Sequence, residues 1–398
     1  MDDPAGRLRI ALNWDSERWR VDIRSSRPLA ASRVFSGKPV AEVARQIPLL
    51  YSLCATAQSQ AFTAAAESIL NLAPDASTRL CRQQLLHAEL IKEHLWRLLL
   101  DWPPLLGLTR EDALMARVMA AWQGLRSQLR VTGEPFIPSA RIDRPTASAN
   151  ESALSALIAL GEQASLGTTA ADWLAACDSL EQWRRFADSA QTPAAAMARA
   201  LHEQELETLG QTRTAFLTQP DLSAIEQQLS GALGSTSTDA FIAAPSIKGR
   251  CYETTPLARM AGEPLIASLM QTHGNGLLTR FAALLVELAQ ALAEASAVSN
   301  HAPPIQSLHP RSDTSLAAVQ AARGLLVHRL VLRDGRVERH QVLAPTEWNF
   351  HPQGVLNQAL SRLPPGGKAA DRTEIERLAD LLVTAIDPCV DYSISLEA

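Results

Sequence analysis

The chain has 398 residues, of which 46% are hydrophobic and 20% charged, a composition typical of globular proteins with a large core. Its formal net charge is −5 and no Lys/Arg-rich block is present, which argues against nucleic acid as a partner. The sequence contains no run of about 18 apolar residues, and its opening MDDPAGRLRI contains no apolar segment, so we expect neither a membrane span nor a signal peptide.

The first half of the chain predicts two short strands followed by helices. Residues 8–23 read as two strands around a polar turn. Apolar residues then recur every three or four positions, which predicts helices at 40–73, with a break near Pro48, at 78–102 and at 110–129.

The second half alternates between expected loops and helices. Residues 131–152 carry three prolines and no periodicity, which predicts a loop, and a helical pattern then resumes to about residue 209. Residues 229–245 are small and polar and predict another loop. A long helix is expected at 276–298. The alternating stretch 325–343 has Asp334-Gly335 at its centre, a pair that favours a β-hairpin turn.

These elements predict a mainly α (α+β) fold, with a helical-bundle core and β-hairpins near both termini. We expect one domain over residues 1–398. The polar segment 309–313 is interpreted as a loop before a helix.

The cysteines give little when each is taken alone. There are five, Cys54, Cys81, Cys177, Cys251 and Cys389, and no Cys-x-x-Cys motif joins any two of them. An odd, scattered set argues against a disulfide framework and for a reducing cytoplasm. Free cysteines are commonly small core residues, which is the simplest interpretation of each.

Six stretches, taken in order, resemble segments of the nickel–iron hydrogenase large subunit. They cover both ends of the chain well and residues 103–245 poorly. They are GRLRI (6–10), LCATAQSQA (53–61), GRCYETTPLARM (249–260), AARGLLVH (321–328), LAPTEWNF (343–350) and DPCVDY (387–392).

The departures from that family remove half of its metal ligands. The resemblance implies a Cys-x-x-Cys pair at each end, but the second cysteines are replaced by Ala57 and Tyr392. Ala61 and Ser395 stand where the family has histidines, and no glutamate lies between Glu17 and Glu42, where the family keeps one for proton transfer. A bridged nickel–iron site needs four thiolates, so we expect no hydrogen turnover and no nickel. The sequence runs only three residues past Ser395, which predicts no cleaved extension.

The pattern resembles the HupK/HoxV type of hydrogenase maturation protein. The resemblance implies a cytoplasmic, non-catalytic scaffold that transiently carries iron with its cyanide and carbon monoxide ligands. Cys54 and Cys389 are the implied metal ligands. The implied partners are the hydrogenase large-subunit precursor and the maturation proteins that deliver iron. The alternative left open is a metal-free chaperone that holds the precursor.

The resemblance also implies residues around the diatomic ligands. Arg323 matches an arginine that faces the cyanides, and Thr346 matches a hydroxyl donor to the second cyanide. Ala322, Leu326 and Pro345 would form an apolar wall. Without the resemblance, Arg323 reads as a structural ion-pair residue and Thr346 as a turn hydroxyl. The segment 252–259 is interpreted as a structural junction between a loop and a helix.

Overall fold

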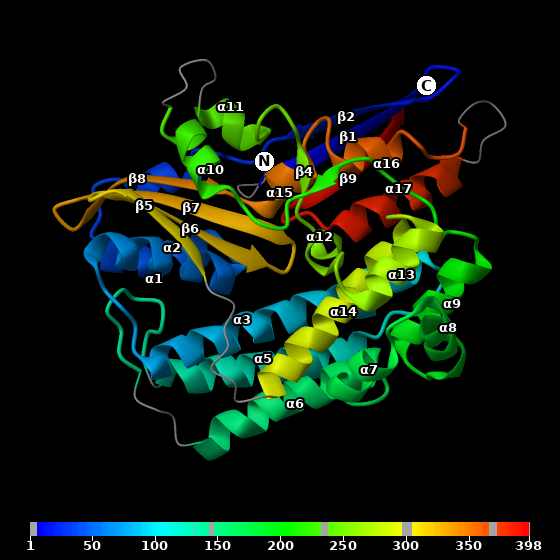
Figure 1. Cartoon of the computed structure of the whole chain (residues 1–398), viewed down its shortest axis with the longest axis horizontal. Helices are drawn as coiled ribbons and strands as arrows, with labels where there is room; N and C mark the ends of the chain where they lie inside the picture. Colours follow the sequence, from blue (N-terminus) through cyan, green and yellow to red (C-terminus); the bar gives the residue numbers. More distant parts are fainter. Residues whose placement is uncertain are drawn as a thin grey trace.

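The computed structural model describes residues 6–131, 133–142, 147–231, 238–296, 305–365 and 372–397. A bundle of long helices fills one side of the molecule, and two β-sheets lie side by side on the other (Figure 1). The helical core with hairpins near both ends is therefore confirmed. No described helix is long and apolar enough to cross a membrane.

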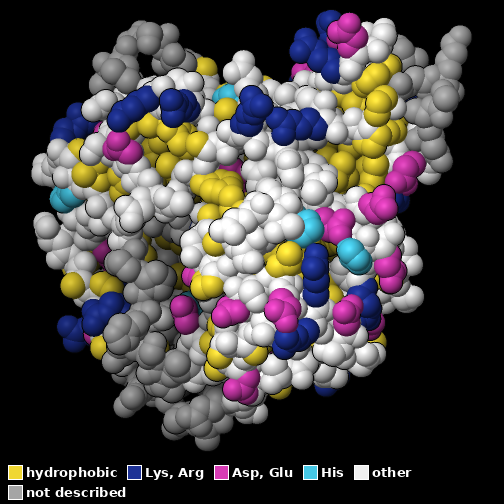
Figure 2. Space-filling model, turned by 45° about the vertical axis from the view of Figure 1, so that its right-hand side comes forward, with side chains coloured by type: hydrophobic (Ala, Val, Ile, Leu, Met, Phe, Trp, Pro, Cys, Tyr) yellow, Lys and Arg dark blue, Asp and Glu magenta, His cyan; other side chains and the backbone are white. Residues whose placement is uncertain are grey.

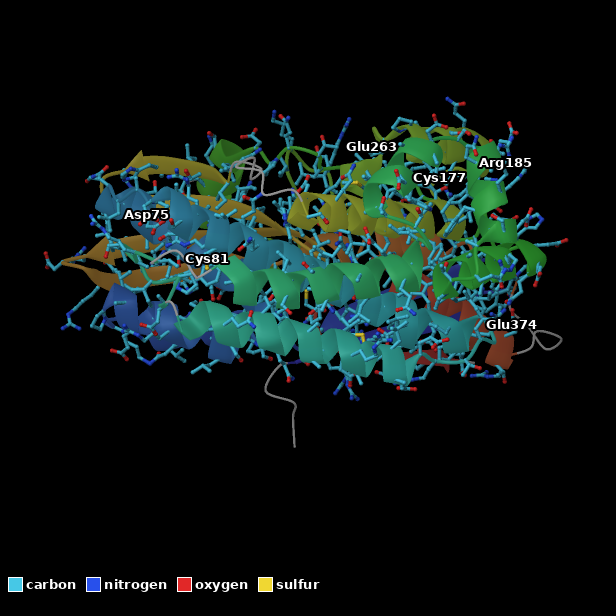
Figure 3. The ribbon with its side chains drawn as sticks, turned by 90° about the horizontal axis from the view of Figure 1, so that it is seen from below. Asp75, Cys81, Cys177, Arg185, Glu263 and Glu374 are labelled. Carbon is cyan, nitrogen blue, oxygen red and sulfur yellow. The ribbon has the colours of Figure 1, made fainter. Side chains whose placement is uncertain are left out.

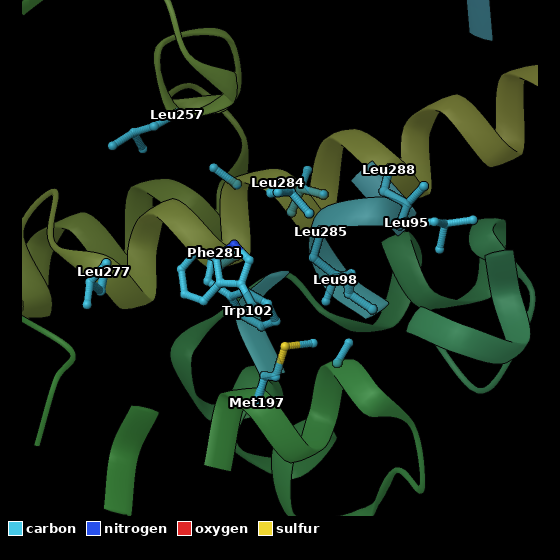
Figure 4. Close-up of a cluster of buried hydrophobic side chains, with 14 of the residues drawn as sticks. Leu95, Leu98, Trp102, Met197, Leu257, Leu277, Phe281, Leu284, Leu285 and Leu288 are labelled. Atoms are coloured by element: carbon cyan, nitrogen blue, oxygen red, sulfur yellow. The ribbon is translucent and has the colours of Figure 1, made fainter. Parts of the chain in front are cut away.

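The bundle is built around α14 (Leu277–Ser296), which contacts both α3 (Ala76–Trp96) and α6 (Ala147–Ser165). The helix α5 (Asp112–Val131) packs against α3 and α6. Because α14 is apolar on nearly every side, it can only be stable in the interior. Figure 4 shows its aromatic contact, in which Phe281 of α14 lies 5.2 Å from Trp102, measured between ring centroids.

A four-stranded antiparallel sheet lies above α1 (Val40–Leu50) and α2 (Figure 1). Its order is β5 (Gln306–Arg311), β6 (Thr314–Ala321), β7 (Gly324–Arg333), β8 (Arg336–Leu343). Asp334 and Gly335 have φ values of 51° and 71°, so the expected β7–β8 hairpin turn is confirmed. The helix α2 (Ala55–Leu70) packs on β6 and β7.

The second sheet joins the two ends of the described chain. Strands β1 (Arg7–Trp14) and β2 (Trp19–Ser25) form the hairpin expected at 8–23. Strand β9 (Asp391–Glu397) pairs with β1 in parallel, a pairing that the sequence analysis did not anticipate. The helix α17 (Arg372–Ile386) leads into β9.

Several boundaries differ from expectation. The loop predicted at 131–152 does not extend over all of that range, because α6 begins at Ala147, and residues 132 and 143–146 lie outside the described residues. The segment 229–245 contains α11 (Thr238–Ala243), and its residues 232–237 lie outside the described residues. The loop-before-helix interpretation of 309–313 is wrong, because this segment ends β5 and turns into β6.

The remaining helices connect or cap these layers. They are α1 (Val40–Leu50), α4 (Trp102–Leu105), α7 (Ala170–Ala176), α8 (Leu180–Ser189), α9 (Pro193–Glu203), α10 (Leu222–Leu229), α12 (Pro256–Met260), α13 (Pro264–His273), α15 (Pro345–Asn349) and α16 (Val355–Leu360), with a 3-10 turn at Ala31–Phe35 and a π-helical turn at Arg97–Asp101. The short strands β3 (Ala215–Phe216) and β4 (Tyr252–Glu253) pair in parallel.

Candidate metal centre

The fold brings Cys54 and Cys389 into direct contact, although they lie near opposite ends of the sequence. Cys54 lies in the break between α1 and α2, as the residue immediately before α2. Cys389 lies between the end of α17 and the start of β9. Both residues are buried, with 7% and 8% of their surface exposed, and their thiols are hydrogen-bonded to each other.

The contact shifts the pKa values of the two thiols in opposite directions. The hydrogen bond to Cys389, together with burial, raises the pKa of Cys54 well above the ordinary thiol value. The same hydrogen bond lowers the pKa of Cys389, and Arg323 and Arg27 lower it further against the opposing effect of burial. Cys389 is therefore the thiol that ionises first, with Cys54 as the hydrogen-bond donor to its sulfur.

Arg323 lies in the two-residue turn between β6 and β7, beside the thiol pair. Its Nε donates to Asp387 Oδ1 at 2.9 Å, and its Nη2 lies 2.8 Å from Glu93 Oε2. Its Nη1 is buried and has no hydrogen-bond partner among the described residues. The guanidinium thus makes the structural ion pairs that the sequence alone favours, and it also retains one buried donor group for a ligand.

Gly324 allows this turn to lie close to its neighbours. It has a φ of +136°, and an added Cβ would come 2.5 Å from the Thr254 hydroxyl oxygen. The side chain of Asn349 spans the same contact, because its Nδ2 donates to the Arg323 carbonyl and its Oδ1 accepts from the Thr254 N–H. Any side chain at 324 would push the Arg323 turn away from its place beside the thiols.

Of the other residues predicted to surround the site, two contact or share a cluster with a thiol residue, and two are chain neighbours of site residues. Thr346 is 2% exposed, and its hydroxyl accepts the Cys389 backbone N–H at 3.0 Å. Leu326 belongs to the same buried cluster as Cys54. Pro345 begins α15 directly before Thr346, and Ala322 directly precedes Arg323.

The segment 252–259 is the junction that the sequence predicts, with β4 leading into α12. It also supports the Arg323 turn, because Arg259 Nη2 donates to the Ala322 carbonyl at 3.1 Å. Arg259 is held in turn by Glu287 of α14, with Nη2 at 2.7 Å from Oε2.

The four positions where the resemblance would place further ligands or histidines hold side chains in other roles. Ala57 and Ala61 are 2% and 0% exposed and belong to the apolar cluster around Cys54. The Tyr392 side chain is hydrogen-bonded to Asp380 and Thr384 of α17, and Ser395 lies exposed on β9. In the described part of the chain, no three His, Cys, Asp or Glu side chains are placed to hold one metal ion.

A chain of buried polar side chains behind Cys54 was missed by the sequence analysis. Gln58 Nε2 lies 3.6 Å from the Cys54 sulfur, and its Oε1 lies 2.8 Å from His328 Nε2. His328 Nδ1 lies 3.1 Å from His340 Nε2. Burial lowers the pKa of both histidines, so both are neutral, and Gln58 is oriented with its amide N–H toward sulfur.

The other cysteines are structural. Cys81 and Cys177 are buried at separate places in the helical region, well apart in Figure 3. Burial raises the pKa of Cys81 to about 11 and that of Cys177 to about 12. Each therefore remains a neutral thiol.

Comparisons with known proteins find relatives that cover nearly the whole chain. The family model described as nickel-dependent hydrogenase matches residues 257–390. The hydrogenase expression/formation protein HupV of Azotobacter chroococcum mcd 1 is 30% identical over 98% of this chain and 99% of its own length. The hydrogenase expression/formation protein HupK of Azotobacter vinelandii is also 30% identical, with the same coverage of both chains.

Solved structures share the fold at lower identity. The Ni-Fe-Se hydrogenase from D. vulgaris Hildenborough in the reduced state aligns with a TM-score of 0.63 and 15% identity. The alignment covers 94% of each chain. The similarity at this identity establishes a common α+β architecture.

Proposed function

This chain belongs to the family of hydrogenase expression/formation proteins that includes HupV and HupK, and from this premise we propose that it is a non-catalytic scaffold in hydrogenase maturation. Its cargo is the iron fragment carrying cyanide and carbon monoxide. The scaffold receives this fragment from the iron-delivering maturation proteins and passes it to the nickel–iron hydrogenase large-subunit precursor.

The contact between Cys54 and Cys389 carries the proposal. Two thiolates on one metal, each with a bond of about 2.3 Å, lie about 3.3 Å apart at a right angle and about 3.8 Å apart at a tetrahedral angle. Two hydrogen-bonded thiols need a similar separation, so the metal can replace the shared proton with little movement of the backbone. Low-spin iron with cyanide and carbon monoxide is soft enough to favour thiolates.

The surroundings of the pair suit an anionic, diatomic-bearing cargo. The unpartnered Nη1 of Arg323 is a buried donor for a cyanide nitrogen. Thr346 provides a hydroxyl beside Cys389 as a second donor, and Leu326 contributes to an apolar wall. Two thiolates are fewer than the four ligands of a closed structural site, which keeps the fragment exchangeable.

The test is iron analysis and infrared spectroscopy of protein purified anaerobically from cells that contain the maturation machinery. We expect iron in the protein and absorption bands of metal-bound cyanide and carbon monoxide, where proteins do not absorb. Cys54→Ala, Cys389→Ala and the double variant should each lose the bands to the same extent, because two ligands of one metal act as a unit. Cys81→Ala and Cys177→Ala are the matched controls and should retain them.

The role of Arg323 is best tested with a substitution that keeps its positive charge. Arg323→Leu would leave two buried carboxylates, Asp387 and Glu93, with fewer counter-charges and would destabilise the protein. Arg323→Lys keeps the charge but removes the forked donor. We expect it to retain iron and to shift the cyanide bands.

The same experiment separates the scaffold from a metal-free chaperone. A chaperone would support maturation of its hydrogenase at the normal rate when Cys54 is replaced by alanine. That result in vivo, with the variant present at wild-type levels, would overturn the scaffold proposal.

A further inference from the structure

A cavity lies where the loop before β3, the loop before β4 and the segment between α15 and α16 meet, and neither thiol of the Cys54–Cys389 pair lines it. The cavity is open to solvent and has a volume of about 430 Å³, a size suited to a small ligand. Arg213 and Thr214 contribute from the first loop, Arg250 and Cys251 from the second, and Gln353 from the third.

The charge of this lining is positive. Arg213 and Arg250 both line the cavity, and no Asp or Glu does. Neither guanidinium forms an ion pair with any carboxylate in the described parts of the chain. The arginines therefore form a local positive site on a protein whose net charge is −5. On the face drawn in Figure 2, Lys and Arg side chains form small groups among acidic side chains.

Thr214 provides a second, independent sign of a ligand. The residue is 7% exposed and lines the cavity, yet its hydroxyl has no hydrogen-bond partner among the described residues. Buried hydroxyls are normally satisfied, so this group lacks a partner that an oxygen-rich ligand could supply.

The first loop is held in place by bonds that do not use its cavity-lining side chains. The Thr212 N–H donates to Asn275 Oδ1 at 2.8 Å, and the Arg213 N–H donates to Gln358 Oε1 at 2.9 Å. The Gln211 carbonyl accepts from Arg362 Nη1 at 2.6 Å. The backbone is thus fixed before a ligand arrives, while the Arg213 guanidinium remains available.

The second loop is a tight turn that projects Arg250 beside the first. Ile247 and Arg250 exchange both backbone hydrogen bonds, at 3.0 and 3.1 Å, across Lys248 and Gly249. Lys248 and Gly249 both have positive φ, 53° and 73°, as this type of two-residue turn requires. No atom outside the turn lies within 4 Å of the position that a Cβ on Gly249 would take, so this side of the turn is uncovered.

We propose that this cavity binds a small oxyanion ligand, bearing phosphate or carboxylate groups, through the Arg213 and Arg250 guanidiniums and the Thr214 hydroxyl. Guanidinium groups match both anions with paired N–H donors. Among the lining residues His351 carries the only ring, so the site has little surface for stacking a nucleobase, and the anionic group itself is what it recognises.

The experiment is titration calorimetry on the full chain in low-salt buffer. Inorganic phosphate, pyrophosphate and succinate serve as probes, and sodium chloride at matched ionic strength serves as the reference. We expect saturable binding of at least one probe above the chloride reference. Tighter phosphate or pyrophosphate binding assigns the natural ligand to phosphate compounds, and tighter succinate binding assigns it to carboxylates.

Arg213→Gln and Arg250→Gln should each weaken binding of that probe by about 10- to 100-fold, the usual effect of losing a charge-assisted hydrogen bond. Arg117→Gln, on the exposed face of α5, is the matched control and should bind as the wild type does. Thr214→Val should weaken binding without lowering the unfolding temperature of the ligand-free protein, because it removes a hydroxyl that has no partner.

The proposal is overturned if no probe binds above chloride, or if Arg117→Gln weakens binding as much as Arg213→Gln does. Both results are independent of the thiol pair, because Cys54→Ala should leave anion binding unchanged. Failure here therefore leaves the scaffold proposal standing, and failure of the scaffold proposal leaves this site standing.

Discussion

The hydroxyl of Thr346 accepts the backbone N–H of Cys389 at 3.0 Å, within the buried region where α15 meets the segment after α17. This bond fixes the backbone that carries the Cys389 thiol. Thr346 lies far from Cys389 in the sequence and belongs to a different secondary-structure element. The bond gives Thr346 a structural task that exists before any metal is bound.

Substitutions at Thr346 should separate the contribution of this hydrogen bond to stability from the contribution of side-chain packing. Thr346→Val leaves the buried Cys389 N–H without a partner, and we expect a loss of about 1–3 kcal/mol in the free energy of unfolding. Thr346→Ser retains the hydroxyl and should lose less. Urea denaturation of the metal-free proteins measures both, and equal midpoints for the valine and serine variants would contradict the prediction.

Mild oxidation should join Cys54 to Cys389. One hydrogen peroxide molecule takes two protons and two electrons from the pair, so a disulfide forms, the O–O bond breaks and two water molecules are released. Cys389 has the lowered pKa needed for attack, whereas the pKa values of Cys81 and Cys177 are raised.

Free-thiol titration after unfolding should show the loss of two thiols, and dithiothreitol should restore both. Cys54→Ser should abolish this paired loss, while Cys177→Ser should leave it intact. The oxidised protein should take up no iron fragment. Iron uptake undiminished by oxidation would indicate a site that does not use the pair.

Acid should destabilise the protein in part through Glu287. Burial alone would raise the pKa of this carboxyl, but Arg259 and His94 outweigh burial and lower the pKa to about 2. Since the folded pKa is below the unfolded value of 4.5, the stabilisation is complete above pH 4.5 and is lost as the pH falls toward 2.

The size of this effect is about 3 kcal/mol, from about 1.4 kcal/mol for each unit of pKa. The measurement compares the free energy of unfolding of wild type and Glu287→Gln between pH 2 and 6. The variant should be less stable at pH 6 and should lose less stability on acidification. Glu181→Gln, in an exposed pair with Arg185, should follow the wild-type curve.

Nickel should find no tight site in this protein, because the positions that would complete the site are Ala57 and Tyr392. Equilibrium dialysis of the wild type should show none, and a stoichiometric site that depends on both Cys54 and Cys389 would contradict this.

The structure also predicts which of two added cysteines, at position 57 or at position 392, would bind nickel more tightly. Ala57 lies in the Cys54 cluster, one helical turn into α2, so Ala57→Cys places a third thiol at the pair. Tyr392 is bonded to Asp380 and Thr384 of α17, and Tyr392→Cys removes those bonds. We therefore expect Ala57→Cys to bind nickel more tightly than Tyr392→Cys does.

Most of the helices and both terminal hairpins could be predicted from the sequence, because their signals are local. The β7–β8 turn rests on Asp334-Gly335, and the helix α14 on its apolar pattern. The strand β6 could not be predicted in this way, because its sequence TSLAAVQA is rich in alanine, a helix former. Its conformation is decided by pairing with β5 and β7 and by packing against α2.

The residues of the site likewise differ in whether the sequence alone could identify them. Cys54 and Cys389 could be paired only through the order of motifs along the chain, since neither has a distinctive neighbourhood in sequence. The Gln58–His328–His340 chain could not be found, because a helix and two strands contribute its members and none follows a pattern. The Nη1 of Arg323 is distinguished only by the ion pairs that occupy the other two nitrogens.

The parallel pairing of β9 with β1 has a consequence for the order of events during synthesis. A ribosome releases Cys54 early, and at about 5–20 residues per second it exposes the segment around Cys389 only after tens of seconds more. Until then β1 lacks its parallel neighbour, and the buried apolar cluster around Cys54 lacks the second sulfur. For the proposed two-thiolate site, loading therefore requires that translation has delivered both ends of the fold.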